Sequence, residues 1–228
     1  MKKIRIYIAI ILLVIMAVSV HLLYIFNIIP HKKYTNEDFG IAIYISEVDK
    51  DGDGIDDQTD ILQNVRAYIA TNPEYKSKYY AGGYPDDGYG VCTDVVAQGF
   101  LHAGYDLREL VDADIAGHPE LYDVTKADPN IDFRRVRNLL VYFQNHAISL
   151  TTDLMQINEW QGGDVIVFKK HIGIVSDKRN KNGVPFVIHH ANPYQWYYEE
   201  DILENRNDIV GLLELADASF HGHEALGK

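Results

Sequence analysis

The amino-acid sequence predicts an α+β domain that follows an N-terminal membrane segment. Between residues 61 and 146 the apolar side chains fall mainly at helical spacing, whereas from Gly162 onward they follow the two-residue spacing of strands. The chain has a single cysteine, Cys92, at the point where a loop rich in Gly, Pro and Asp gives way to a helical run. Helices that precede an antiparallel sheet are typical of the α+β class.

Residues 1–33 form the predicted membrane anchor. Ile6–Ile29 is almost wholly apolar, and its 24 residues are long enough to cross a bilayer. A secretory signal has a shorter apolar region that ends in a small-residue cleavage site, and 17–19 matches such a site only weakly. We therefore expect an uncleaved signal anchor rather than a cleaved signal peptide. Basic residues flank both ends, but the three nearest the N-terminus favour a cytoplasmic N-terminus and an extracytoplasmic domain.

The charge of the remaining chain excludes one class of partner. The whole chain has a net charge of −12; without the five basic residues of the anchor, residues 34–228 keep 16 basic and 33 acidic residues, which gives −17. Nucleic-acid binding needs basic surface, so we expect no nucleic-acid partner. A lone cysteine also excludes an intramolecular disulfide in a compartment that permits disulfides.

An aspartate-rich loop follows a linker and entry segment at 34–48. Within residues 49–60, acids occupy positions 1, 3, 5, 9 and 12, with glycine at position 6, which is the spacing of calcium loops. Position 12 is Asp60 rather than a bidentate glutamate, and the string looks more like the aspartate-rich calcium repeats of thrombospondin. The alternative is a solvated acidic turn in which Asp60 caps the next helix. We expect structural Ca²⁺ bound by Asp49, Asp51, Asp53, Ile55, Asp57 and Asp60.

Residues 61–215 form the predicted main domain. Helices are expected at 61–72, 92–102 and 132–146, with short helices and turns at 105–128. Strands are expected at 164–169, 171–177, 184–190 and 209–215, with a hairpin turn at 179–183. The tail, 216–228, has no pattern and is expected to be flexible.

Cys92 is the candidate nucleophile. Unpaired N–H groups and the macrodipole at a helix N-terminus favour negative charge, so a thiol placed there ionises more easily and the N–H groups can hold an oxyanion. The alternative is a buried cysteine that acts as a small hydrophobe. A redox-sensing thiol is a further option, which the absence of a resolving cysteine weakens.

A cysteine nucleophile needs a base and a group that orients the base. His171 opens the second expected strand, and His189, His190 and Asn192 lie one hairpin further on. Cross-strand neighbours are close enough for a side-chain hydrogen bond. A register in which paired residue numbers sum to 360 places His189 opposite His171, and a sum of 361 places His190 there. Spacing leaves these alternatives open.

Five strings then carry a resemblance. They are GVCTDVV (90–96), NIDFRRV (130–136), EWQGGD (159–164), HIGIVSD (171–177) and VIH (187–189). In this order they resemble a bacterial family of unknown function, numbered 1287, over residues 49–215, and that family is similar to the NlpC-type cell-wall cysteine peptidases of the papain-like superfamily. The resemblance implies a papain-like fold, with Cys92 as nucleophile, His171 as base and His189 as orienting residue.

The resemblance also implies a function. We expect a membrane-anchored cysteine peptidase or amidase that cleaves amide bonds in peptidoglycan peptides. Thr93-Asp94 replaces the usual Ser-Gly, so we expect Asp94 to affect substrate recognition, and Tyr84, Tyr89 and Trp196 are expected to line the groove. The rivals are an acyltransferase or transpeptidase with the same triad and a non-catalytic, calcium-stabilised binding module.

Overall fold

The computed structural model describes residues 2–215, which divide into two compact units between Lys32 and Lys33. The first unit contains helix α1, Lys2–Ile25, which is long and apolar enough to cross a membrane. Both ends of this helix lie four residues closer to the N-terminus than the expected span, Ile6–Ile29. Asn27, just after the helix, has a φ of 54°. The predicted tail at 216–228 lies outside the described residues.

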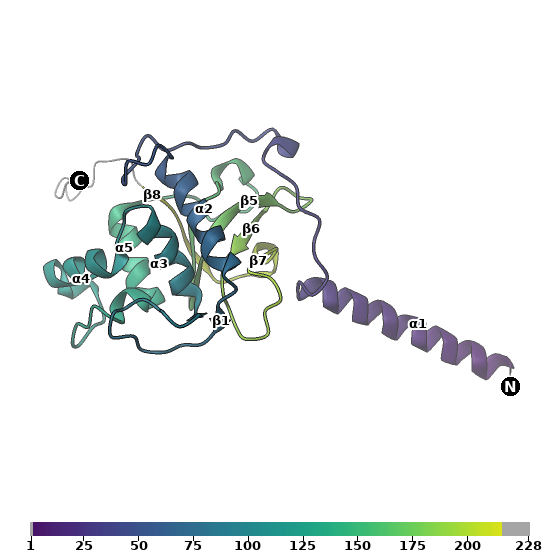
Figure 1. The fold of residues 1–228 in the computed structure, drawn as a ribbon. Helices are drawn as coiled ribbons and strands as arrows, with labels where there is room; N and C mark the ends of the chain where they lie inside the picture. The colour runs from purple at the N-terminus through teal and green to yellow at the C-terminus, as the bar shows by residue number, and fades with distance from the viewer. Residues whose placement is uncertain (1, 216–228) are drawn as a thin grey trace. The chain divides into compact units, whose positions relative to one another are not determined.

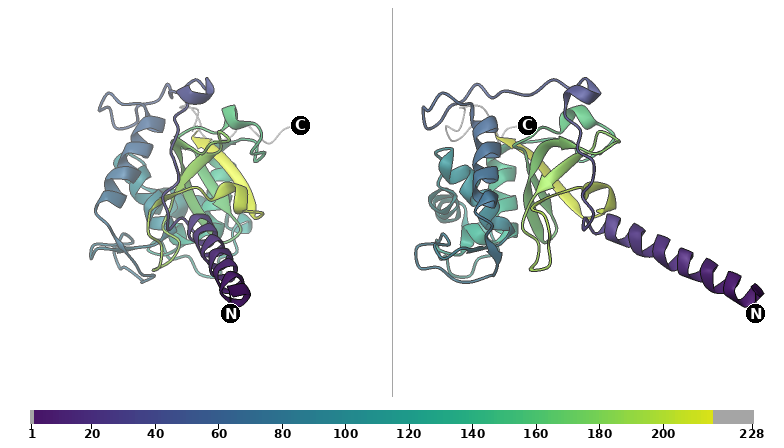
Figure 2. Two further views of the ribbon diagram at one scale, coloured as in Figure 1. Left: turned by 90° about the vertical axis from the view of Figure 1, so that its right-hand side faces the viewer. Right: turned by 45° about the vertical axis from the view of Figure 1, so that its right-hand side comes forward.

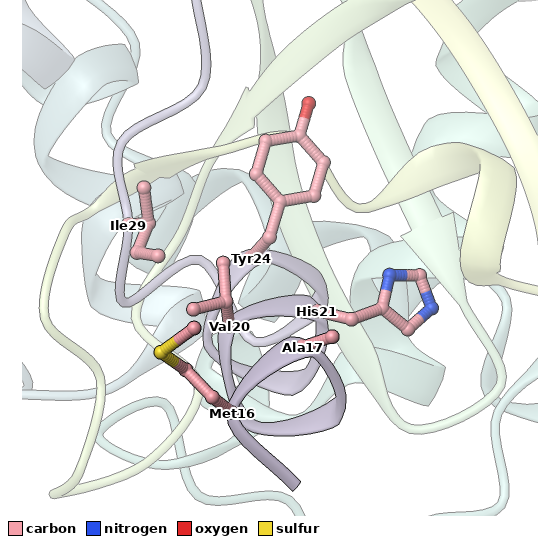
Figure 3. A pocket seen from close by; sticks show the side chains of 6 residues that line it. All are labelled: Met16, Ala17, Val20, His21, Tyr24 and Ile29. Carbon is pink, nitrogen blue, oxygen red and sulfur yellow. The ribbon is translucent and has the colours of Figure 1, made fainter. Parts of the chain in front are cut away.

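A hollow on the first unit is formed by one face of α1 and the turn that follows it. Figure 3 shows that its six lining residues belong to this segment alone: Met16, Ala17, Val20, His21, Tyr24 and Ile29. Five of the six side chains are apolar or aromatic, which suits a helix surface in contact with lipid.

The second unit begins its helical part at α2, Asp57–Ala70, four residues before the sequence predicts. The N-cap is Asp56, whose side chain accepts the N–H of Thr59, so the alternative in which Asp60 caps this helix is wrong. Asp60 is instead a buried residue in the first turn. The acidic string offered several capping residues, and only tertiary contacts decide among them.

The predicted cysteine helix is confirmed as α3, Cys92–His102. The segment at 105–128 contains α4, Leu107–Gly117, capped by Asp106, and a short 3-10 turn at Pro119–Leu121. The third expected helix is divided into a 3-10 turn, Asp132–Arg134, and α5, Val136–His146. Further 3-10 turns lie at Glu37–Phe39, Ile157–Glu159 and Leu203–Asn205.

The expected antiparallel sheet is present and has six strands, in the order β3-β8-β4-β5-β6-β7, with every neighbouring pair antiparallel. The strands are β3 (Ala147–Ser149), β4 (Val165–Phe168), β5 (His171–Arg179), β6 (Pro185–Ile188), β7 (Glu199–Glu200) and β8 (Ile209–Leu215). The structure adds β3 and β7 to the four strands expected from sequence. A separate parallel pair, β1 (Glu74–Tyr75) and β2 (Tyr89–Gly90), leads directly to Cys92.

Helices α2, α3, α4 and α5 lie on one side of the sheet, as Figures 1 and 2 show. Alternate strand residues divide between two apolar clusters: Val165 and Val167 of β4 pack with the helices, whereas Ile166 and Phe168 pack on the opposite face around Trp160. Burial of both faces explains why β4 reads as a continuous apolar run. Contacts of α3 with β5 place the start of the cysteine helix beside the strand that His171 begins.

Candidate active site

Cys92 is the first residue of α3 and is partly exposed. The backbone N–H of Cys92 itself, that of Thr93 and that of Ile172 near the start of β5 lie close to its sulfur, where they favour the thiolate. The first two groups belong to the helix N-terminus, where N–H groups have no partner within the helix. The third group places the thiol next to His171, because the N–H of Ile172 follows His171 directly in the chain.

Asp94 holds the start of the cysteine helix and is fully buried. Its Oδ2 accepts the N–H of Val91 at 2.8 Å, and its two oxygens accept from Arg134 at 2.6 and 2.8 Å. Both oxygens are thus engaged inside the protein, so the expectation that Asp94 contacts substrate is wrong. Sequence alone did not reveal this role because Arg134 is 40 residues away.

His171 and His189 form the centre of the site. Nε2 of His171 lies 2.9 Å from Nδ1 of His189, and the two rings meet edge to face. Strand β5 pairs Ile174 with Ile188 and Val175 with Val187, so paired residue numbers sum to 362 rather than the expected 360 or 361. An even sum keeps the two histidines on the same face, where they meet as diagonal rather than direct neighbours.

Gly173 makes room for this diagonal contact. A Cβ at position 173 would lie 3.1 Å from Cβ of His189 and 2.8 Å from the carbonyl oxygen of Ile188. A side chain there would push β6 away from β5. The glycine of the His-x-Gly string therefore allows the ring of His189 to approach that of His171.

His190 and Asn192, the alternatives for the third residue, are used elsewhere. The ring of His190 packs between those of Tyr75 and Tyr198, with centroids 5.2 and 5.0 Å away. Asn192 is exposed, and its side chain accepts the N–H of Tyr194. Of the three residues considered, His189 is the one whose ring contacts His171.

A carboxylate that sequence reasoning missed stands behind the histidine pair. Oε2 of Glu200, on β7, lies 3.2 Å from Nε2 of His189, and both residues are buried. Strand β7 has two residues and pairs with β6. Glu200 sits in a run of acidic residues, so the sequence gives no signal that separates it from its neighbours.

Burial controls the protonation of the site. It raises the pKa of the Cys92 thiol to about 11, against the hydrogen bonds to its sulfur, which lower it. Burial also lowers the pKa of both His171 and His189 to about 3. Burial thus outweighs the effect of the helix N-terminus, which was expected to make the thiol of Cys92 ionise more easily. The thiol and both imidazoles are neutral at pH 7 in the substrate-free protein.

The three aromatic residues expected to line a groove each have contacts of their own. The hydroxyl of Tyr84 donates to Asp106 at 2.7 Å, and Tyr89 lies 4.7 Å beneath the ammonium groups of both Lys76 and Lys78. Trp196 is exposed and lines a hollow of about 620 Å³ that also includes His190. Of the three, Trp196 is placed in a surface hollow next to the histidine segment.

The aspartate loop is only partly arranged as expected. Oxygen atoms of Asp49, Asp51 and Asp53 lie within 4.8 Å of one another and are exposed. Asp57 points elsewhere, because its carboxylate accepts the N–H of Lys50 at 2.7 Å and the hydroxyl of Tyr105. Burial, and then the charges of Asp53 and Asp51, raise the pKa of Asp60, which places it near the other acids.

Fold and site together define an α+β domain in which a single cysteine at a helix start lies close to the strand that begins with one of two contacting histidines. The family model described as a domain of unknown function (DUF1287) matches residues 62–213, and the chain belongs to this family. The chain is similar to "Uncharacterized protein YijF" of Escherichia coli (strain K12), with 33% identity over 152 residues, which cover 63% of this chain and 73% of that protein. No solved structure matches the chain.

Proposed function

We propose that this protein is a membrane-anchored cysteine hydrolase with a Cys92–His171–His189 triad. The observation that carries the proposal is the meeting of three separate elements: the sulfur at the start of α3 lies close to the N–H of Ile172, the second residue of β5, and the ring of His171 contacts His189 just after β6. A nucleophile, a base and an orienting group in this order are the requirements of covalent acyl transfer.

Because the thiol of Cys92 and the imidazole of His171 are both neutral before substrate binds, the thiol must lose its proton during the attack. Because Nε2 of His171 is engaged with His189, Nδ1 is the ring nitrogen left to accept a proton. Nδ1 takes the thiol proton as sulfur attacks the carbonyl carbon, and the N–H groups at the start of α3 stabilise the oxyanion. His171 then donates this proton to the leaving amine. In the second half it takes a proton from water, whose oxygen displaces the thiolate from the acyl group, and sulfur recovers its proton.

Substrate class and location rest on the resemblance and on α1. The similarity to NlpC-type enzymes supports amide bonds of peptidoglycan peptides as the substrate. A cytoplasmic N-terminus followed by a membrane-spanning α1 would place the domain outside the cytoplasm, where peptidoglycan lies. The strongly acidic domain is consistent with a substrate other than nucleic acid.

Purified peptidoglycan provides the test of the reaction class. The full chain in detergent should release new peptide amino and carboxyl termini in equal amounts, as hydrolysis requires. When an amine acceptor is added, a transferase would instead join the acyl group to that amine and release no free carboxyl group. Absence of either product would contradict the proposal and favour the binding module.

We further propose that the loop at 49–60 binds Ca²⁺ in a structural role, on the strength of its ligand spacing. Asp49, Asp51 and Asp53 fit as ligands, since their oxygens already converge, and a cation would relieve the charge that raises the pKa of Asp60. Asp57 does not fit, because its carboxylate is held by Lys50 and Tyr105. Carbonyl oxygens or water would complete the shell.

Calcium should stabilise the folded protein. At about 100 times the dissociation constant, binding adds about 2.7 kcal/mol, which in a chain of this size raises the melting temperature by about 5–10 °C. Melting curves with Ca²⁺ and with a chelator measure the difference. Asp51→Asn with Asp53→Asn should remove it, whereas Asp86→Asn, in another exposed loop, should not. An equal melt in Ca²⁺ and chelator would contradict calcium binding.

A further inference from the structure

Glu200 lies at the far end of a line of three side chains, His171, His189 and Glu200. Nε2 of His171 is 2.9 Å from Nδ1 of His189, and Nε2 of His189 is 3.2 Å from Oε2 of Glu200. The second contact is an ion pair by distance, and Nε2 of His189 has no well-directed hydrogen-bond partner among the described residues. His189 and Glu200 are only 3% and 8% exposed, so water offers little competition for this contact.

The line of contacts has two arrangements of protons, and only one can activate the thiol. A neutral imidazole carries a proton on one ring nitrogen and a lone pair on the other. In the first arrangement Nε2–H of His171 donates to Nδ1 of His189, which leaves the lone pair on Nδ1 of His171 free to accept the proton of Cys92. In the second, Nδ1–H of His189 donates to Nε2 of His171. The proton of His171 then occupies Nδ1, and the ring is no base toward the thiol.

The carboxylate distinguishes the two arrangements. In the first, His189 carries its proton on Nε2, and Oε2 of Glu200 is the acceptor within reach of that proton. In the second, the lone pair on Nε2 of His189 faces the carboxylate oxygen at 3.2 Å, so two acceptors meet inside the protein. Arg206 and Asp208 are the other charged groups near His171. They do not select between the two arrangements, because Arg206 donates to Asp208 at 2.7 Å and the two groups pair with each other.

We propose that Glu200 is a positioning residue that fixes the tautomers of His189 and, through it, of His171. The proposal rests on the proposed function, in which His171 is the base. Glu200 touches neither the thiol nor the substrate. It acts two rings away, by making the base-competent arrangement of protons the stable one.

The neighbouring Glu199 provides a matched control. It precedes Glu200 on β7, but its carboxylate contacts Lys33, Ser176 and Arg66 at 2.5, 2.5 and 3.0 Å. Glu199→Gln therefore removes the same charge from the same strand and leaves the histidine pair untouched. Glu200→Gln keeps the shape of the side chain, yet its amide can donate to Nε2 of His189 and stabilise the unproductive arrangement.

The test measures alkylation of Cys92 by iodoacetamide at pH 7, with the full chain in detergent. Cys92 is the one cysteine of the chain, so the reagent reports on this thiol alone. Glu200→Gln should slow alkylation by about tenfold to a hundredfold, the effect typical of groups that orient a functional histidine, whereas Glu199→Gln should react like the wild type. If Glu200→Gln reacts at the wild-type rate while His171→Ala is slow, the positioning role is wrong and the Cys–His pair stands. If His171→Ala itself reacts at the wild-type rate, the proposed function fails first.

A second measurement does not depend on activity. Nitrogen chemical shifts of selectively ¹⁵N-labelled histidines show which ring nitrogen carries the proton. In the wild type, His171 and His189 should both be protonated on Nε2, and Glu200→Gln should move protons to Nδ1. A wild-type His171 protonated on Nδ1, or tautomers unchanged in Glu200→Gln, would overturn the proposal.

Discussion

Replacing Cys92 with alanine should abolish hydrolysis, with a loss of at least about 10⁴-fold in turnover. The thiol is the nucleophile, and no second cysteine exists to replace it. His171→Ala should cost nearly as much, because a thiol whose pKa is raised to about 11 depends on a base at pH 7. The double variant should be no worse than either single variant, since residues that act as a unit do not contribute additively.

Release of peptide termini from peptidoglycan measures these losses. Because Cys92 is partly exposed, Cys92→Ala should fold and melt almost like the wild type. A variant that keeps both its fold and full turnover would show that the cysteine is not the nucleophile. A variant that keeps binding to peptidoglycan but has no turnover would be the expected result for a cysteine hydrolase.

The second large effect is expected at Asp94, on stability. The side chain of Arg134 is only 2% exposed, and Asp94→Ala leaves its guanidinium without a carboxylate partner. The same substitution removes the acceptor for the N–H of Val91. Breaking one side of a buried ion pair costs about 3–5 kcal/mol, so the melting temperature should fall by about 10 °C or more. Thermal melting monitored by circular dichroism measures the shift.

A second ion pair on the surface provides the control. Arg137 and Asp123 lie 2.6 Å apart, but their side chains are 53% and 88% exposed. Asp123→Ala should change the melting temperature little, because solvent screens such a pair. If Asp94→Ala melted like the wild type and raised KM instead, Asp94 would be a substrate-binding residue, as the sequence alone led us to expect.

The cysteine helix was predictable because its signals are local. A loop rich in Gly, Pro and Asp followed by a run without helix breakers predicts a helix at 92–102, and the structure has it with the same bounds. The strand at 209–215 was likewise predicted with its observed bounds. The start of α2 was not, because Asp56, Asp57 and Asp60 are equivalent in sequence. Their roles differ through contacts with Ser46, with Lys50 and Tyr105, and with the interior.

The histidine pair was predictable only in part. Spacing placed His171 and His189 one hairpin apart, but the register depends on an irregularity between Val175 and Arg179 that no local signal marks. That irregularity moves the pairing sum from 364 at the turn to 362 at Val175, which brings His189 within diagonal reach of His171. Glu200 escaped prediction for the same reason, since a two-residue strand acquires its neighbours only from the assembled sheet.

The pH dependence of the reaction of Cys92 with iodoacetamide is the decisive test of whether Cys92 and His171 form an assembled pair. With a pKa of about 11 for the thiol and about 3 for His171, the pair is neutral between these values, and the imidazole assists the thiol throughout. The wild-type rate should therefore stay nearly constant from pH 5 to 9 and fall only in stronger acid, where His171 takes up a proton. The rate of His171→Ala should be about a hundredfold lower at pH 7 and should rise with each pH unit, as the fraction of thiolate does. Two identical profiles that both rise as for a free thiol would contradict the pair, and with it the proposed hydrolase.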